Sequence, residues 1–234
     1  MRILVTRPRA DGEETAARLA RMGHEALLAP LLETRWFDGP PLALEGVAAI
    51  LATSANGVRA LIRRTSRRDV TILAVGPQTA QEAQDAGFTR IENADGDAIA
   101  LAAAVPRWVT PAEGALLHVC GEQNEGALAE RLESQGYRVR REILYVVEPR
   151  PLPQEAVAAL QDGRVEAALF FSPRSARIFI EQAEAATLAR VTACCISPAT
   201  AKALPPGLFG DIRIAAKPNQ DALLALLASL SHPA

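Results

Sequence analysis

The chain of 234 residues has few of the residue types from which metal and disulfide sites are built. Its three cysteines are Cys120, Cys194 and Cys195, and no Cys-x-x-Cys pair occurs. An odd number of cysteines without that spacing indicates neither a disulfide framework nor a zinc site. The three histidines are far apart in the sequence. We therefore expect no metal site.

The sequence also lacks an excess of positive charge. Lys and Arg total 25 against 27 Asp and Glu, and the formal net charge is -2. This balance argues against nucleic acid and anionic membrane surfaces as partners. A small acidic ligand remains compatible with it, because main-chain amides bind carboxylates without changing the net charge.

Long apolar runs are missing too. No stretch approaches the roughly 20 apolar residues of a membrane span. The apolar run that opens the chain is too short for the hydrophobic core of a signal peptide. We therefore expect a soluble, cytoplasmic protein.

Aromatic residues make up only 4% of the chain, whereas 49% of it is hydrophobic. A composition dominated by Ala and Leu favours helices and short aliphatic strands over an aromatic-rich β-sandwich. The length fits one large domain or two of about 100 to 120 residues.

Short apolar strands alternate with helical segments along the whole chain, which predicts an α/β fold with parallel sheets and helices on both faces. Asp11 is expected to cap the first helix, with Glu14 as its capping-box partner. The expected strands are 2–6, 47–53, 71–75, 90–92, 115–119, 167–171, 192–196 and 212–215, with long extended runs at 25–37 and 137–147. Further helices are expected at 54–64, 78–86, 97–104, 124–135, 174–183, 199–204 and 220–230.

The two halves of the sequence resemble each other in order, which indicates an internal duplication. Residues 3–33 align with 116–146, and Thr53-Ser54 aligns with Phe171-Ser172. Pro77-Gln78-Thr79-Ala80 likewise aligns with Pro198-Ala199-Thr200-Ala201.

A long extended run follows the first βα unit of each half. If each run carries the chain into the other lobe, the two lobes exchange their first βαβ units. One lobe would then comprise residues 1–35 and 150–234, and the other residues 40–145. Two connectors, at about 33–40 and 144–150, would form a two-stranded linker between them.

The segments that follow the predicted strands combine small, hydroxylic or glycine residues with the start of a helix. In parallel α/β sheets ligands bind beyond the carboxyl ends of the strands, and free N–H groups at helix starts suit carboxylates. Each serine has a structural interpretation as well, because Ser-Pro before a helix is a good N-cap followed by proline at the first helical position. The segments concerned are Thr6-Arg7-Pro8, Thr53-Ser54-Ala55-Asn56, Gly76-Pro77-Gln78-Thr79, Cys120-Gly121-Glu122-Gln123, Ser172-Pro173-Arg174-Ser175 and Ser197-Pro198-Ala199-Thr200.

Several common catalytic and nucleotide-binding motifs are absent. The sequence contains no Gly-x-Ser-x-Gly elbow, no phosphate-binding Gly-x-x-x-x-Gly-Lys-[Ser/Thr] loop and no Gly-x-Gly-x-x-Gly after the first strand. Arg63-Arg64 and Arg67-Arg68 form a basic cluster after a predicted helix. We interpret this cluster as a solvated helix end in preference to a binding patch.

Taken together, the ordered motifs resemble the uroporphyrinogen-III synthase family over the full length of the chain. Two positions depart from the family's pattern: Phe171, where threonine is more frequent, and Ser197, where glycine is more usual. The resemblance rests on Val5-Thr6-Arg7-Pro8, Thr53-Ser54-Ala55-Asn56-Gly57-Val58, Ala74-Val75-Gly76-Pro77-Gln78-Thr79-Ala80, Tyr145, Phe171-Ser172-Pro173-Arg174-Ser175-Ala176 and Ile196-Ser197-Pro198-Ala199-Thr200-Ala201.

This resemblance implies two flavodoxin-like lobes joined by a two-stranded linker. It implies a linear tetrapyrrole, hydroxymethylbilane, as substrate and uroporphyrinogen III as product, in a monomeric enzyme without a cofactor. The substrate-binding residues would be Arg7, Thr53, Ser54, Asn56, Gly76, Thr79, Gly121, Ser172, Ser175, Ser197 and Thr200.

The resemblance also places a functionally important tyrosine at Tyr145, one of two tyrosines in the chain. A phenol can donate a hydrogen bond while staying protonated at neutral pH, so Tyr145 is the candidate catalytic residue. The structural alternative is a strand tyrosine whose ring packs against a helix.

Two other functions share the predicted architecture. The chain could be a two-lobed small-molecule binding protein without catalysis, although such proteins are usually exported. It could also be a regulatory protein on an inactive synthase fold. Incubation with hydroxymethylbilane, followed by analysis of the isomer formed, separates these from the enzyme.

Overall fold

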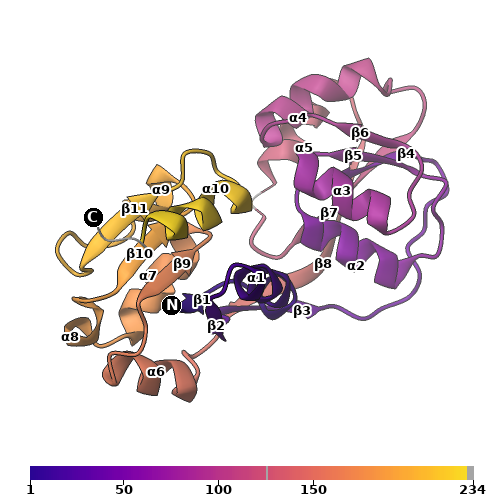
Figure 1. Ribbon diagram of the computed structural model, residues 1–234. Coiled ribbons are helices and arrows are strands. Elements are labelled where there is room, and N and C mark those ends of the chain that lie inside the picture. The colour runs from indigo at the N-terminus through magenta and orange to yellow at the C-terminus, as the bar shows by residue number, and fades with distance from the viewer. Residues whose placement is uncertain (125, 231–234) are drawn as a thin grey trace. The chain divides into compact units, whose positions relative to one another are not determined.

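The structure is a computed structural model that describes residues 1–124 and 126–230 (Figure 1). The chain divides into two compact units. Unit 1 is Met1–Glu33 together with the chain from Glu148 onward, and unit 2 is Thr34–Val147. Each unit is built around one β-sheet.

Unit 1 contains a five-stranded parallel sheet in the order β11-β10-β9-β1-β2. Its strands are β1 (Arg2–Val5), β2 (Glu25–Leu28), β9 (Ala167–Phe170), β10 (Thr192–Cys195) and β11 (Asp211–Ile214). Its helices are α1 (Arg9–Arg21), α6 (Gln154–Gln161), α7 (Pro173–Gln182), α8 (Ala185–Leu188), α9 (Pro198–Ala201), α10 (Gln220–Ala225) and the 3-10 helix η2 (Leu226–Ser229).

The sheet of unit 2 has six strands in the order β3-β8-β7-β4-β5-β6 and is mostly parallel. Its strands are β3 (Leu32–Trp36), β4 (Val47–Ala52), β5 (Thr71–Ala74), β6 (Ile91–Asn93), β7 (Ala115–Gly121) and β8 (Val139–Pro149). The helices are α2 (Ala55–Arg64), α3 (Pro77–Asp85), α4 (Ala98–Ala104), α5 (Ala127–Glu133) and the 3-10 helix η1 (Val105–Arg107).

The pairing of distant strands confirms the predicted exchange of the first βαβ units. Ile3 of β1 pairs with Ala167 of β9, and Ala167 pairs with Thr192 of β10. When β1, β2, β9, β10 and β11 are numbered one to five, their spatial order is 2-1-3-4-5, the flavodoxin-like order. The strands β7, β8, β4, β5 and β6 of unit 2 follow the same order, as the predicted duplication requires.

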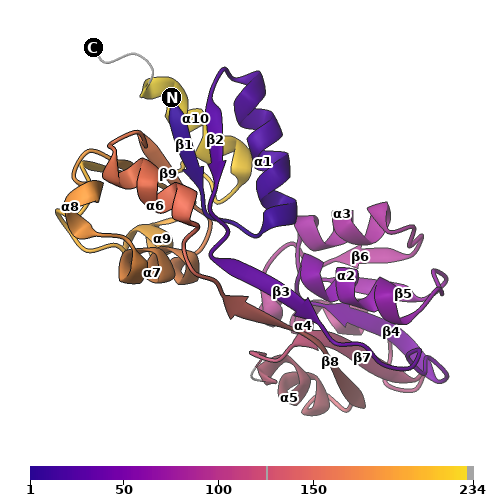
Figure 2. The same ribbon diagram turned by 90° about the horizontal axis from the view of Figure 1, so that it is seen from below.

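Buried side chains on alternate strand residues form a separate core on each face of a sheet. In unit 1, Leu4, Ala168 and Phe170 pack against α6 and α7, whereas Ile3 and Val5 pack against α1 and α10. Figure 2 shows α1 and α10 on one side of this sheet and α6, α7 and α8 on the other. Because both faces are covered, the strands have the continuous apolar sequences from which they were predicted.

Unit 2 is built in the same way. Ile50 and Leu117 face α2 and α3, and Leu51 and Leu116 face α4 and α5. The loops that leave the carboxyl ends of the strands are consequently held above a rigid sheet, and they carry the predicted ligand-binding residues.

Three local predictions need correction. Helix α1 begins at Arg9 with Pro8 as its N-cap residue, so Asp11 lies in the first turn and does not cap it. Its carboxylate instead forms an ion pair with Arg7. Helix α6 (Gln154–Gln161) was not predicted, because no element was expected between the second connector and the strand at 167–171. The predicted helix 124–135 is shorter, Ala127–Glu133, and Glu125 lies outside the described residues.

Within the described ranges, 1–124 and 126–230, no helix is long and apolar enough to cross a membrane.

Candidate functional site

A cavity of about 220 Å³ lies at the carboxyl ends of β4 and β7 in unit 2. These two strands are neighbours in the sheet, and the strand order reverses between them. Ligands of open α/β sheets bind at such a switch point. The cavity brings together four of the predicted site residues, and its lining is Thr53, Ser54, Gly121, Gln123, Asn124, Tyr145 and Val147.

Ser54 links the start of a helix to the tyrosine of the cavity. It is the N-cap residue of α2, and its Oγ accepts a hydrogen bond from the Gly57 main-chain N–H at 3.1 Å. The same Oγ lies 2.9 Å from the hydroxyl oxygen of Tyr145, and either group can donate that bond. Ser54 is therefore both an N-cap and a partner of the candidate catalytic phenol.

Tyr145 is 7% exposed, and two residues, Trp36 and Gly121, lie close to its ring. The ring of Trp36 lies at 5.9 Å between centroids with a tilt of 58°. On the β7 side, a Cβ atom added to Gly121 would lie 2.7 Å from Cε2 of Tyr145. Only glycine leaves room for the ring at this position, and the register between β7 and β8 shifts there.

Burial raises the pKa of the Tyr145 phenol above its ordinary value, and the hydrogen bond with Ser54 offsets part of that effect. A phenol with a raised pKa is protonated at neutral pH and is suited to donating a hydrogen bond.

Beneath the cavity, Thr53 contacts a buried histidine. Thr53 Oγ1 lies 3.4 Å from Nε2 of His118, whose side chain is fully buried in β7. The other ring nitrogen, Nδ1, is buried without a hydrogen-bond partner. Burial lowers the pKa of His118 to about 4, and the charge of Arg141 contributes in the same direction. The imidazole is therefore neutral under physiological conditions.

The other predicted residues of unit 2 lie on neighbouring helix starts outside this cavity. Gly76 is the N-cap residue of α3, and Thr79 is buried in the first turn of that helix. Asn56 donates a hydrogen bond from Nδ2 to Thr34 Oγ1 at 3.2 Å. Helices α2 and α3 follow the adjacent strands β4 and β5, and their N-termini thus provide main-chain donors at the same edge of the sheet.

In unit 1, Arg7 lies at the equivalent switch point, where β1 adjoins β9. Its guanidinium carbon is 4.4 Å from the ring centroid of Phe171. The guanidinium donates from Nη1 to Oε1 of Gln220 at 2.7 Å and pairs with Asp11 at 3.2 Å. The unusual Phe171 therefore acts as a platform for Arg7.

The remaining predicted residues of unit 1 form two equivalent helix caps. Ser172 Oγ accepts from the main-chain N–H of Ser175 at 3.1 Å and lies 2.9 Å from the Ser175 hydroxyl. Ser197 Oγ lies 3.0 Å from Oγ1 of Thr200 and caps α9 in the same way. Ser175 and Thr200 are buried. The N-cap interpretation of these serines is therefore confirmed, and a ligand would meet main-chain donors beside them.

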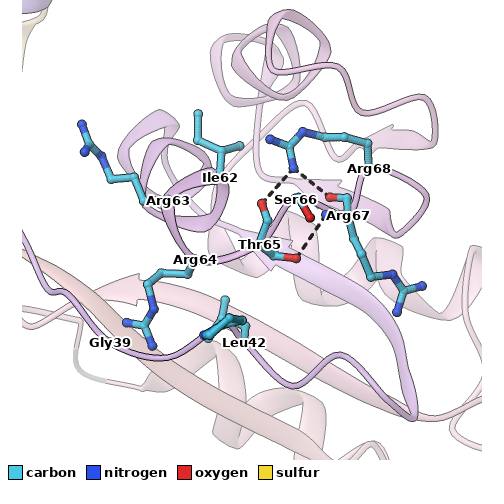
Figure 3. Close-up of a pocket in the computed structure, with 10 residues that line it drawn as sticks. Gly39, Leu42, Ile62, Arg63, Arg64, Thr65, Ser66, Arg67 and Arg68 are labelled. Atoms are coloured by element: carbon cyan, nitrogen blue, oxygen red, sulfur yellow. Dashed lines mark hydrogen bonds between the residues drawn. The ribbon is translucent and has the colours of Figure 1, made fainter.

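A larger hollow, of about 600 Å³, lies beside the arginine cluster that follows α2. Figure 3 shows Arg63, Arg64 and Arg67 pointing away from one another. Arg64 donates to the carbonyl oxygens of Pro40 and Phe37, and Arg68 donates to that of Ala86. The guanidinium groups thus tie loops to the end of α2, which favours the helix-end interpretation over an anion site.

Within the part of the chain that the structure describes, no group of three or more His, Cys, Asp or Glu side chains could hold a metal ion.

The cavity includes residues that were not among the sequence candidates. Gln123 and Asn124 line it, and His118 supports Thr53 from below. Gln123 was placed in a strand-end loop from the sequence, but nothing in its immediate neighbours distinguishes it from other exposed polar residues. For His118 the available signal was a lone histidine in an otherwise apolar strand.

The fold and the cavity define an α/β protein of two flavodoxin-like units with a candidate ligand site at a switch point. The family model described as uroporphyrinogen-III synthase HemD matches residues 13–225. The chain belongs to the uroporphyrinogen-III synthase family, whose enzymes cyclise hydroxymethylbilane in tetrapyrrole biosynthesis.

Solved structures support the same fold. The chain is 20% identical to uroporphyrinogen-III synthetase from Helicobacter pylori, over 98% of this chain and 100% of that chain, with a TM-score of 0.68. It is 21% identical to a mutant uroporphyrinogen III synthase from Thermus thermophilus, over 99% of each chain, with a TM-score of 0.57. No curated protein sequence matches the chain significantly.

We predict that Gly121→Ala slows any reaction that depends on Tyr145. The new Cβ would lie 2.7 Å from the ring, which must then move. Displacement of a reacting group by about 1 Å can cost on the order of a hundredfold in rate, so we expect a loss of at least roughly tenfold in turnover. The melting temperature should fall as well. The fall caused by Gly121→Ala should be smaller when it is measured in a Tyr145→Ala background, where the ring is absent. Parental turnover and melting temperature in Gly121→Ala would contradict the packing described here.

We also predict an acid-sensitive contribution of His118 to stability. Its pKa is 6.5 in the unfolded chain and about 4 in the folded one. Between these values the unfolded state takes up a proton that the folded state does not, so the free energy of unfolding falls as the pH falls from 6.5 towards 4. Urea unfolding across this range should show a smaller fall for His118→Leu than for the parent. His24→Leu is the control, since this half-buried ring should contribute less; equal pH dependence in the parent and His118→Leu would refute the prediction.

Proposed function

We propose that this chain converts hydroxymethylbilane to uroporphyrinogen III, with loss of water and inversion of the terminal pyrrole ring. The observation that supports it most directly is the buried, protonated phenol of Tyr145 in a cavity at the switch point of unit 2, paired with Ser54. We further propose that the protein acts as a cytoplasmic monomer without a metal or organic cofactor.

The proposed reaction begins at the hydroxymethyl carbon. Its C–O bond breaks, the hydroxyl leaves with a proton as water, and the adjacent pyrrole stabilises the resulting cation. This carbon bonds to the substituted carbon of the far pyrrole and gives a spiro intermediate. That intermediate breaks and recloses with the terminal ring inverted, and a proton is lost as the pyrrole regains its aromaticity. Since the pyrrole nitrogens stabilise the cation, the protein needs chiefly to hold the chain in one conformation.

Tyr145 would assist the first step, because hydroxide is a poor leaving group. The Gly57 N–H donates to Ser54 Oγ, which leaves the Ser54 hydroxyl proton free for the Tyr145 oxygen. The phenol proton can then point at the hydroxymethyl oxygen. Each bond in such a series polarises the next, so the helix start would strengthen Tyr145 as a donor and help water to leave.

The carboxylates of the substrate would be held mainly by main-chain N–H groups and hydroxyls at helix starts. This proposal fits a net charge of -2 and the repeated caps in both units. Helix N-termini bind anions through free N–H groups and the helix dipole. The proposed binding residues are Arg7, Thr53, Ser54, Asn56, Gly76, Thr79, Gly121, Ser172, Ser175, Ser197 and Thr200.

The test of the function is direct. Purified protein is incubated with hydroxymethylbilane, and the isomer formed is identified after oxidation to the porphyrin. Formation of isomer III above the rate of spontaneous closure supports the enzyme. Only the uninverted isomer, at the spontaneous rate, would leave a binding or regulatory protein as the explanation.

For Tyr145→Phe we predict a retained fold and a turnover lower by roughly tenfold or more, at the low end of general-acid effects or below. The uninverted isomer should also rise, because uncatalysed closure competes with the slower enzyme. Tyr137→Phe is the matched control: this tyrosine is also buried, but its hydroxyl donates to the carbonyl of Val109 at 2.7 Å. It should lose stability without a change in isomer ratio. If Tyr145→Phe keeps the parental rate and isomer ratio, Tyr145 only packs.

A further inference from the structure

We propose that Gln123 is a positioning residue that holds the strand carrying Tyr145. The proposal rests on the function proposed above for Tyr145. Gln123 follows the end of β7, and its side chain reaches across to β8.

The main-chain ladder between β7 and β8 ends just before the cavity. Its register shifts at Gly121, which is opposite Tyr145. The Glu122 N–H still donates to the Tyr145 carbonyl at 2.8 Å. The chain then turns, with the Asn124 N–H donating to the Gly121 carbonyl at 3.0 Å, and β7 itself ends at Gly121.

Beyond the end of β7, the side-chain amide of Gln123 forms hydrogen bonds with β8. Its Nε2 donates to the carbonyl of Val147 at 3.2 Å, and its Oε1 accepts from the N–H of Val147 at 3.4 Å. Alternate residues of a strand direct their N–H and C=O groups to the same side, so Tyr145 and Val147 are bonded successively by the main chain of Glu122 and the side chain of Gln123.

This two-point contact matters because it holds the segment of β8 that borders the cavity. Tyr145 and Val147 both line the cavity. The phenol oxygen lies 2.9 Å from Ser54 Oγ, it also receives a hydrogen bond from the main chain of Gly121, and its ring has Gly121 close on one side. A small movement of 145–147 away from β7 would lengthen the Tyr145–Ser54 bond and misdirect the phenol.

The amide group is chemically specific in this role. Leucine has a similar volume but makes no hydrogen bond. Glutamate has the same length, but it loses the donor and places a charge beside the Val147 carbonyl. We therefore expect Gln123→Leu and Gln123→Glu to behave alike, with kcat lowered roughly fivefold and KM changed by less than about twofold, as misplacement of a reacting group predicts.

The chain offers a matched control in unit 1. Gln182 makes the same kind of two-point contact, accepting from the Leu152 N–H at 2.6 Å and donating to the Arg150 carbonyl at 3.1 Å. Gln182→Leu removes an equivalent pair of hydrogen bonds from a different segment. Its effect on kcat should be the same in the parent and in Tyr145→Phe.

The experiment is a double-mutant cycle in the full-length protein. kcat, KM and isomer ratio are measured for Gln123→Leu, Tyr145→Phe and the double variant, with Gln123→Glu as a second substitution. If Gln123 acts through Tyr145, its fivefold effect should fall below about twofold in the Tyr145→Phe background. Hydrogen exchange of the Val147 amide should also become faster in Gln123→Leu.

The results separate this proposal from the proposed function. A slow Tyr145→Phe combined with an unaffected Gln123→Leu overturns the role of Gln123 alone. The same holds if Gln123→Leu costs fivefold in both backgrounds, since it would then act independently of the phenol. A parental rate in Tyr145→Phe overturns the catalytic role of Tyr145 and, with it, the positioning role of Gln123.

Discussion

The parallel pairing of β4 with β7 is the contact on which the candidate site depends. Ile50 of β4 pairs with Leu117 of β7, residues that are far apart along the chain. This pairing makes the strand order of unit 2 reverse between two central strands, so that the loops leaving them diverge above the sheet. Thr53 and Ser54 from one loop, and Gly121 from the other, then border the cavity into which Tyr145 projects.

The exchange of βαβ units has a consequence for the chemistry. β7 and β8 come last in unit 2, so Tyr145 lies close to the point at which the chain returns to unit 1. Its strand, β8, pairs with β3 on one side and with β7 on the other. In addition to this pairing, the side chain of Tyr145 contacts Ser54, Trp36 and Gly121, and Gln123 contacts the same strand at Val147.

Much of the fold could be predicted because the local signals agree with the tertiary structure. Strands such as Val47–Ala52 are apolar throughout, since helices cover both faces of the sheet. Pro77 and Pro198 mark helix starts, because proline is accepted at the first helical position. Errors occurred where local signals compete: Asp11 resembles an N-cap, yet it lies in the first turn of α1 and its carboxylate pairs with Arg7, which precedes the helix. Helix α6 was missed because the prolines before it indicated a linker.

The sequence by itself determined the α/β class, the duplicated order of elements and the set of small, hydroxylic helix starts, because each is encoded by neighbouring residues. It also singled out Tyr145 through the family resemblance, and Gly121 through its place after a predicted strand. Only the tertiary structure decided that Ser54 contacts Tyr145, that Gly121 makes room for its ring, that Gln123 lines the same cavity, and that His118 contacts Thr53. These contacts join residues on different strands and loops, and their distances depend on strand register and ring packing, which no local pattern in the chain encodes.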